Sequence, residues 1–131
     1  MPLVHLVIAV ALVEFFLFAW AVGRARVRYN VPAPATTGHE TFERYFRVQM
    51  NTLEQLVIFV PSMVMFAYFW SPLIAAALGT LFTIGRAMYF FGYTRSAAGR
   101  HLGFMVSSLP NLALLLGSLA GAIRALLPHA P

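Results

Sequence analysis

Four long apolar segments, separated by short polar ones, run through this chain. The longest uninterrupted one near the start covers residues 3–22 and contains one charged residue, Glu14. Residues 56–70 and 73–85 are also apolar, and a fourth apolar stretch covers residues 102–127. A helix needs roughly 20 residues to cross ~30 Å of hydrocarbon, so the two short segments must extend into their polar flanks. The pattern predicts four membrane-spanning helices, at about residues 3–25, 42–70, 72–94 and 101–127.

Turn-forming residues indicate where these helices begin and end. Ser71 and Pro72 form a serine cap followed by proline at the first helical position, which leaves a very tight turn. Residues 24–41 combine three arginines with prolines, threonines and a glycine, so we expect this stretch to be the one long loop. The first segment lacks a basic start and a small-residue cleavage site, so we expect a retained helix rather than a signal peptide. The fold class expected is an all-α, four-helix integral membrane bundle, one domain over residues 1–131.

The composition agrees with a lipid environment. Sixty per cent of the residues are apolar and 10% are charged, whereas a soluble domain carries about 25% charged residues. All nine basic residues are arginine, and so few charges among apolar residues form no basic face that would suit nucleic acid. The absence of cysteine excludes disulfides and a protein thiol nucleophile. The four histidines lie on separate segments without metal-ligand spacing, so we expect no metal.

The arginines also predict an orientation in the membrane. The first connection and the helix start that follows it carry five arginines, and the third connection carries Arg95 and Arg100. The second connection carries none. Because the first and third connections share one side of a four-helix protein, the positive-inside rule places that side in the cytoplasm.

Polar residues gather at one depth on the second and third helices. Each group follows helical spacing, so each occupies one helix face. Residues at matching distances from the Ser71 turn differ by about 3 Å in height on antiparallel helices. The pairs matched in this way are Glu54 with Arg86, Asn51 with Tyr89, and Arg47 with Tyr93.

Charged groups at membrane depth pair with each other, bind a ligand or line a water-filled cavity. One interpretation of the cluster is a structural Glu54–Arg86 ion pair that holds the bundle together. Anionic lipid headgroups would also attract surplus arginine, although they need no acid. A glutamate and an asparagine within the cluster favour a zwitterionic ligand, such as a γ-glutamyl peptide, with its carboxylates on arginine and its amine on glutamate. We therefore predict a polar pocket at the cytoplasmic end of the bundle.

Two longer motifs occur at residues 42–54, F-E-R-Y-F-R-V-Q-M-N-T-L-E, and at residues 86–96, R-A-M-Y-F-F-G-Y-T-R-S, and they are followed by Arg100. Together they resemble the MAPEG family, the membrane-associated proteins in eicosanoid and glutathione metabolism. The resemblance extends from about Arg26 to the fourth helix. It implies a homotrimer that binds glutathione between neighbouring subunits near the cytoplasmic face, in a bacterial inner membrane or the endoplasmic reticulum.

The resemblance also implies roles for individual residues. Arg26 and Gln49 match contacts that the neighbouring subunit supplies, Arg86 matches a supporting arginine, and Arg100 matches the residue that activates the thiol. The full set of expected glutathione-binding residues is Arg26, Arg47, Gln49, Asn51, Glu54, Arg86, Tyr89 and Tyr93. The expected reaction adds glutathione thiolate to hydrophobic electrophiles, with reduction of lipid hydroperoxides as a side activity.

Two departures from the family pattern narrow the expected chemistry. Several members have a tyrosine where this chain has Gln55, so one glutathione contact is altered. Leukotriene-forming members carry a second arginine where this chain has Val27, which argues for a general transferase or peroxidase instead.

Two alternatives to a transferase remain open at this point. The membrane glutamate Glu14 is similar to that of small four-helix multidrug efflux transporters, although a more ordinary explanation is that it faces the bundle interior and pairs with a polar group. The second alternative is a non-catalytic MAPEG-like regulator. Such members tend to lose the arginine that Arg100 matches, so the presence of Arg100 favours an enzyme.

Overall fold

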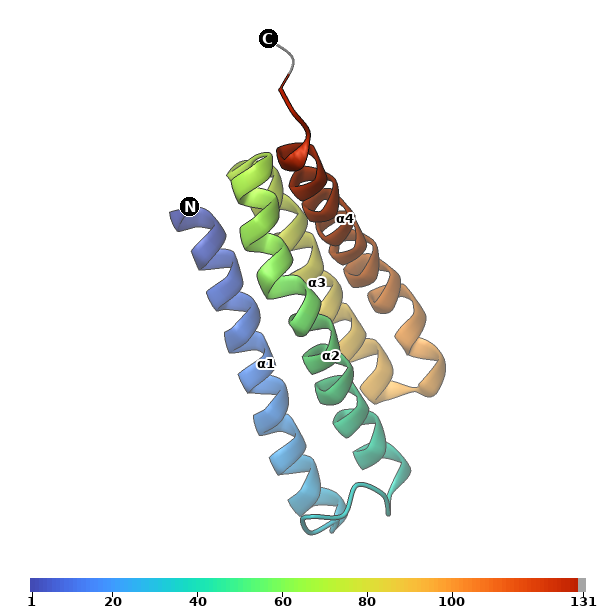
Figure 1. Ribbon diagram of the computed structural model, residues 1–131. Coiled ribbons are helices and arrows are strands. Elements are labelled where there is room, and N and C mark those ends of the chain that lie inside the picture. Colours follow the sequence, from blue (N-terminus) through green and yellow to red (C-terminus); the bar gives the residue numbers. More distant parts are fainter. Residues whose placement is uncertain (130–131) are drawn as a thin grey trace.

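The computed structural model of this protein describes residues 1–129, which form four long antiparallel α-helices (Figure 1). The helices are α1 (Pro2–Tyr29), α2 (Glu40–Phe69), α3 (Pro72–Arg95) and α4 (Arg100–Leu126), with a short 3₁₀ turn, η1 (Ala97–Gly99), before α4. Each of the four helices is long and apolar enough to cross a membrane. The predicted all-α, four-helix architecture is confirmed.

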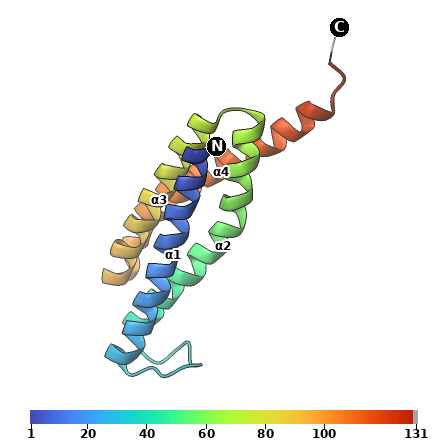
Figure 2. The same cartoon turned by 90° about the vertical axis from the view of Figure 1, so that its left-hand side faces the viewer.

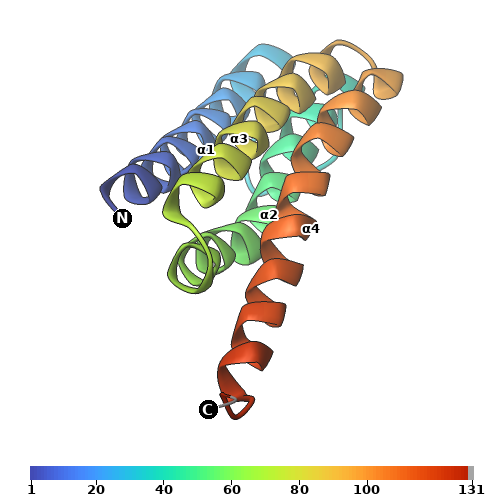
Figure 3. The same cartoon turned by 90° about the horizontal axis from the view of Figure 1, so that it is seen from above.

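The connections alternate between the two ends of the bundle. The loop at residues 30–39 and the η1 connection lie toward one end, and the amino terminus and the α2–α3 turn lie at the other (Figure 1). The carboxy-terminal half of α4 diverges from the other three helices, as two further views show (Figures 2 and 3). The arginine-bearing helix ends that flank these two connections therefore share one end of the bundle, as the alternating topology requires.

The α2–α3 turn forms as its residues predict. The Ser71 hydroxyl accepts a hydrogen bond from the backbone N–H of Ile74 at 3.2 Å, and Pro72 occupies the first turn of α3. The opposite end of α2 is capped by His39, whose Nδ1 accepts from the backbone N–H of Thr41 at 3.1 Å. These side chains satisfy backbone donors that a helix start leaves without partners.

The first helix is longer than expected. α1 continues to Tyr29, so Arg24, Arg26 and Arg28 are helical and do not belong to a loop. Arginine is a good helix former, and cations in the last helical turn interact favourably with the helix dipole. The helix ends at Asn30, which adopts the left-handed conformation with φ 57°, a common way to end a helix.

Apolar side chains fill the interior of the bundle and also cover its outer surface. Phe59 of α2 stacks on Phe82 of α3 with ring centroids 4.0 Å apart, and both rings are fully buried. Phe16 and Trp20 of α1, by contrast, project outward and are more than half exposed. A surface with many large exposed apolar side chains is compatible with a lipid environment rather than with water.

Two glycines allow α3 and α4 to approach very closely. A Cβ added at Gly85 would collide with the backbone of Ser107, and one added at Gly103 would collide with the backbone of Tyr89. Small residues at a helix interface let membrane helices pack backbone against backbone. This contact lies beside Arg86 and brings the α4 hydroxyl of Ser107 within its reach.

Candidate functional site

A fully buried arginine lies at the centre of the polar cluster. Arg86 of α3 donates from Nη2 to Asn51 Oδ1 at 2.8 Å and to Thr52 Oγ1 at 3.0 Å, both on α2. Its Nη1 donates to Ser107 Oγ of α4 at 3.2 Å. The guanidinium carbon also lies 4.3 Å from the ring centroid of Tyr89, a cation–π contact. Arg86 thus joins three helices through hydrogen bonds inside the bundle.

Glu54 and Arg86, which were expected at the same depth, form neither an ion pair nor a hydrogen bond in the described chain. Glu54 is exposed on the outward side of α2, whereas Thr52 on the same helix is buried against Arg86. Within residues 1–129, the ion pair that the structure contains joins Arg44 to Glu40 on one face of α2, at 3.2 Å. The interpretation of Glu54 and Arg86 as a structural ion pair is therefore wrong for this structure. Because Glu54 points outward, the guanidinium of Arg86 donates to oxygens inside the bundle instead.

A second group of polar residues lies at the end of the bundle that carries η1. Arg47 and Tyr93, which were expected at the same depth, line one cavity of about 290 Å³ together with Glu40, Glu43 and Arg44. The cavity contains both carboxylates and guanidinium groups, so it offers partners to either end of a zwitterion. Its carboxylates belong to Glu40 and Glu43, whereas Glu54, the acid of the predicted cluster, does not line this cavity.

The tyrosines connect this cavity to the buried arginine. The rings of Tyr89 and Tyr93 lie 5.5 Å apart between centroids, and Tyr89 is the more deeply buried of the two. The guanidinium carbon of Arg100, at the start of α4, lies 5.8 Å from the centroid of Tyr93. A continuous path of side chains therefore runs from the exposed Arg100 through both tyrosines to Arg86.

The remaining expected site residues lie outside this path. Arg26 donates from Nη1 to the backbone oxygen of Ala35 at 2.7 Å and to that of Val31 at 3.3 Å, so it holds the first loop against α1. Gln49 is half-buried on α2 and makes no side-chain hydrogen bond within the described chain. The single chain does not bring either residue to the Arg86 cluster.

Sequence reasoning missed two partners of the central arginine. Thr52 and Ser107 are ordinary small polar residues in apolar helices, and Ser107 belongs to α4, where no polar face was identified. A buried hydroxyl in a membrane helix can bond its own backbone, as both do here, to Val48 and Gly103 respectively. The spacing of the motif residues alone carries no signal that these hydroxyls also accept from a guanidinium.

Gln55, which replaces a family tyrosine, is engaged within the protein. Asn111 of α4 donates from Nδ2 to the Gln55 side-chain oxygen at 2.8 Å and to its backbone oxygen at 3.2 Å. The Gln55 side chain therefore ties α2 to α4 one turn from Asn51.

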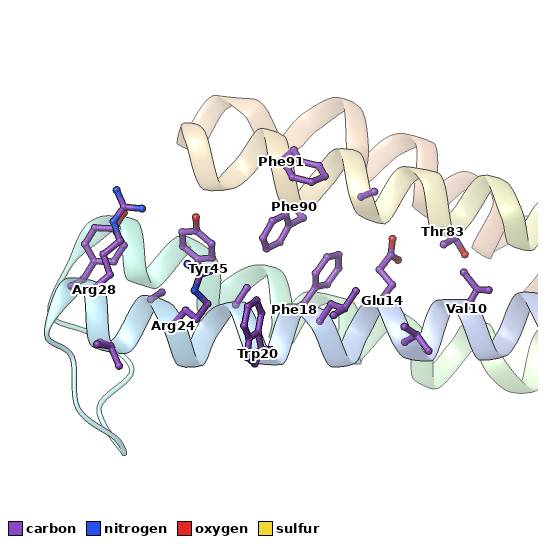
Figure 4. Close-up of a pocket in the computed structure, with 17 residues that line it drawn as sticks. Val10, Glu14, Phe18, Trp20, Arg24, Arg28, Tyr45, Thr83, Phe90 and Phe91 are labelled. Carbon is purple, nitrogen blue, oxygen red and sulfur yellow. The ribbon is translucent and has the colours of Figure 1, made fainter.

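Glu14 of α1 lies on a different side of the bundle, in a larger cavity of about 940 Å³ between α1 and α3 (Figure 4). Its carboxyl group points from α1 toward α3, near Thr83, and its Oε1 atom is buried without a hydrogen-bond partner. Arg24 and Arg28 line the same cavity nearer the first loop, and aromatic rings such as Phe18 and Phe90 line it between. Glu14 thus faces the bundle.

These features define a class of protein: a four-helix integral membrane protein with arginines and tyrosines gathered at one end of the bundle. The chain belongs to the MAPEG family, whose profile matches residues 4–120.

Its similarity to individual proteins supports the same assignment. It is 42% identical to microsomal glutathione S-transferase 2 of Homo sapiens over 106 residues, which cover 81% of this chain and 70% of that protein. It is 33% identical to leukotriene C4 synthase of Cavia porcellus over 118 residues, covering 84% and 79%. It is also 46% identical to an uncharacterized protein of Synechocystis over 114 residues, covering 87% and 83%. Family membership removes the basis for the efflux-transporter interpretation of Glu14.

Proposed function

We propose that this protein is a membrane-bound glutathione transferase that activates glutathione as a thiolate and conjugates it to hydrophobic electrophiles. The observation that carries the proposal is the side-chain path from Arg100 through Tyr93 and Tyr89 to the Arg86–Asn51 pair. Relatives named as glutathione S-transferase and leukotriene C4 synthase support it.

Binding in this proposal uses opposite charges at the two ends of glutathione. Arg47 and the neighbouring arginines attract the carboxylates, and Glu54 provides the counter-charge for the amine. Asn51 has its side-chain oxygen occupied by Arg86, which leaves its amide N–H groups for the ligand. Tyr93 supplies a hydroxyl at the cavity wall.

Arg100 is the proposed activating residue. A free thiol with a pKa near ~8.5 is a few per cent thiolate at neutral pH. Lowering that pKa by ~2 units takes about 2.7 kcal/mol of stabilisation for the thiolate. A guanidinium remains charged and can donate two hydrogen bonds, so it stabilises the thiolate without taking the proton, which passes to water. The thiolate sulfur then forms a bond to the electrophilic carbon as the leaving group departs or the electrophile takes up a proton.

We further propose that the site is completed by a neighbouring subunit in a homotrimer, at the cytoplasmic face. Arg47, Glu54 and Arg100 are exposed on the single chain, and Arg26 and Gln49 lie away from the Arg86 cluster. A neighbour could supply these last two residues to the ligand. Chemical cross-linking or native mass spectrometry in detergent measures the number of subunits.

The experiment that tests the function is the ultraviolet difference absorbance of thiolate when purified protein in detergent is mixed with glutathione. We expect a signal from the native protein and its loss in Arg100→Ala. Arg95→Ala is the matched control, because Arg95 is an exposed arginine in the same connection and should leave the signal intact. Glutathione binding without thiolate in the native protein would support a regulator, and absence of binding would reject the proposal. Turnover with an aryl halide and with an organic hydroperoxide then separates transferase from peroxidase activity.

A further inference from the structure

Two buried polar atoms on facing helices have no hydrogen-bond partner within the described chain, and they are complementary. One is the acceptor Oε1 of Glu14 on α1, and the other is the donor Nε of Arg86 on α3. The other guanidinium nitrogens of Arg86 are already bonded to α2 and α4. Nε is thus the guanidinium nitrogen of Arg86 that has no hydrogen-bond partner within the described chain.

Glu14 lines the cavity between α1 and α3, and Arg86 belongs to the stretch of α3 that forms the facing wall of this cavity. Thr83 and Ala87 lie one turn before and one residue after Arg86, and both line the α1–α3 cavity with Glu14. The Glu14 carboxyl points across that cavity toward α3 (Figure 4). Glu14 and Arg86 form no direct ion pair within 4.0 Å. Because both atoms are buried without a partner, one water that bonds to each of them would satisfy the donor and the acceptor together.

Among the residues that the structure describes, no other acidic side chain is placed to neutralise Arg86. Helices α3 and α4 contain no acidic residue. On α2, Glu40 and Glu43 lie in the first turn, and Glu54 is exposed on the outward side. A guanidinium inside a membrane protein is costly unless it is paired, and Glu14 is the one acid on α1.

We propose that Glu14 is the counter-ion of Arg86, joined to its Nε–H by one ordered water molecule in the α1–α3 cavity, and that it acts as a positioning residue for the glutathione site. Glu14 holds the guanidinium in the plane from which it donates to Asn51 and contacts the Tyr89 ring. The positioning role rests on the proposed function, whereas the pairing of Glu14 with Arg86 does not.

A double-mutant cycle on thermal unfolding in detergent tests the pairing without glutathione. The variants are Glu14→Gln, Arg86→Gln and the two combined, and the measurement is the midpoint Tm. We expect Glu14→Gln to lower Tm by several degrees when Arg86 is present and to change it little in the Arg86→Gln background. An equal shift in both backgrounds would overturn the pairing. If Arg86→Gln does not fold, the neutral variant Arg86→Met replaces it in the cycle, and the same two outcomes support or overturn the pairing.

Glutathione affinity tests the positioning role. We expect Glu14→Gln to weaken glutathione binding about tenfold, or ~1.4 kcal/mol, with the thiolate yield per bound glutathione unchanged. Glu14→Asp should restore most of the affinity because it keeps the charge and a water can adjust to the shorter side chain.

Leu17→Gln is the matched control for polarity, because Leu17 lines the same cavity but carries no counter-charge. It should bind glutathione as the native protein does. Native affinity in Glu14→Gln, or an equal loss in Leu17→Gln, would overturn the positioning role. Failure of the native protein to bind glutathione would instead reject the proposed function, and the cycle would still decide the pairing.

Discussion

Two arginines each contact one of two neighbouring tyrosines, and they occupy opposite environments. Arg86 is fully buried, lies against Tyr89 and donates to three side chains on two other helices. Arg100 is exposed, lies against Tyr93 and makes no side-chain hydrogen bond within residues 1–129. One guanidinium is committed to the protein, and the other keeps its donors for a ligand. The comparison separates an arginine that builds the site from one that is available for chemistry.

The comparison predicts its largest effect at Arg86. Replacement by alanine removes a buried side chain and leaves three interior oxygens without this donor, which should destabilise the fold by about 3 kcal/mol. Thermal unfolding in detergent measures the loss. An Arg86→Ala protein with native Tm and normal glutathione binding would show that this arginine does not build the site.

Arg100→Ala should show the converse behaviour. We expect turnover to fall by about 100-fold, as for removal of one preorganised charge-stabilising donor, while Tm and much of the glutathione affinity remain. Steady-state conjugation of an aryl halide measures the turnover. Unchanged turnover would remove Arg100 from the proposed mechanism and end the distinction between the two arginines.

Glu54→Ala tests whether the acidic residue of the cluster, like Arg100, serves the ligand rather than the fold. Because Glu54 is exposed and has no partner in the described chain, we expect Tm to change little and glutathione to bind about tenfold more weakly. Isothermal titration provides the dissociation constant. A large fall in Tm with native affinity would instead assign Glu54 a structural role in the assembled protein.

Ser107→Ala tests the smallest of these effects. The Ser107 hydroxyl accepts a hydrogen bond from Arg86 at 3.2 Å. Its loss should lower the free energy of unfolding by about 1 kcal/mol, because one N–H of Arg86 then has no acceptor. Ser108→Ala is the control, because the hydroxyl of Ser108 makes no hydrogen bond within residues 1–129. Equal Tm values for the two variants would contradict the contribution of Ser107 to holding Arg86.

Residue counting predicted the depth of each polar residue along its helix. It was less successful at predicting which partner each side chain contacts. Counting from Ser71 placed Arg47 beside Tyr93, and the two do line one cavity. The same counting paired Glu54 with Arg86, but the guanidinium bonds to Asn51 and Thr52 instead. Rise per residue is fixed by helix geometry, whereas a long flexible side chain reaches acceptors above or below its own level.

The sequence by itself determined the four spans, the capped turn at Ser71 and Pro72, and the family, because hydrophobic length, capping chemistry and motif spacing are local properties. The tertiary structure alone decided which polar groups meet. Packing at Gly85 and Gly103 brings Ser107 to Arg86, and the orientation of α1 turns Glu14 toward α3. Which buried donor finds which acceptor depends on the rotation and approach of helices that are distant in sequence, and no local pattern encodes that choice.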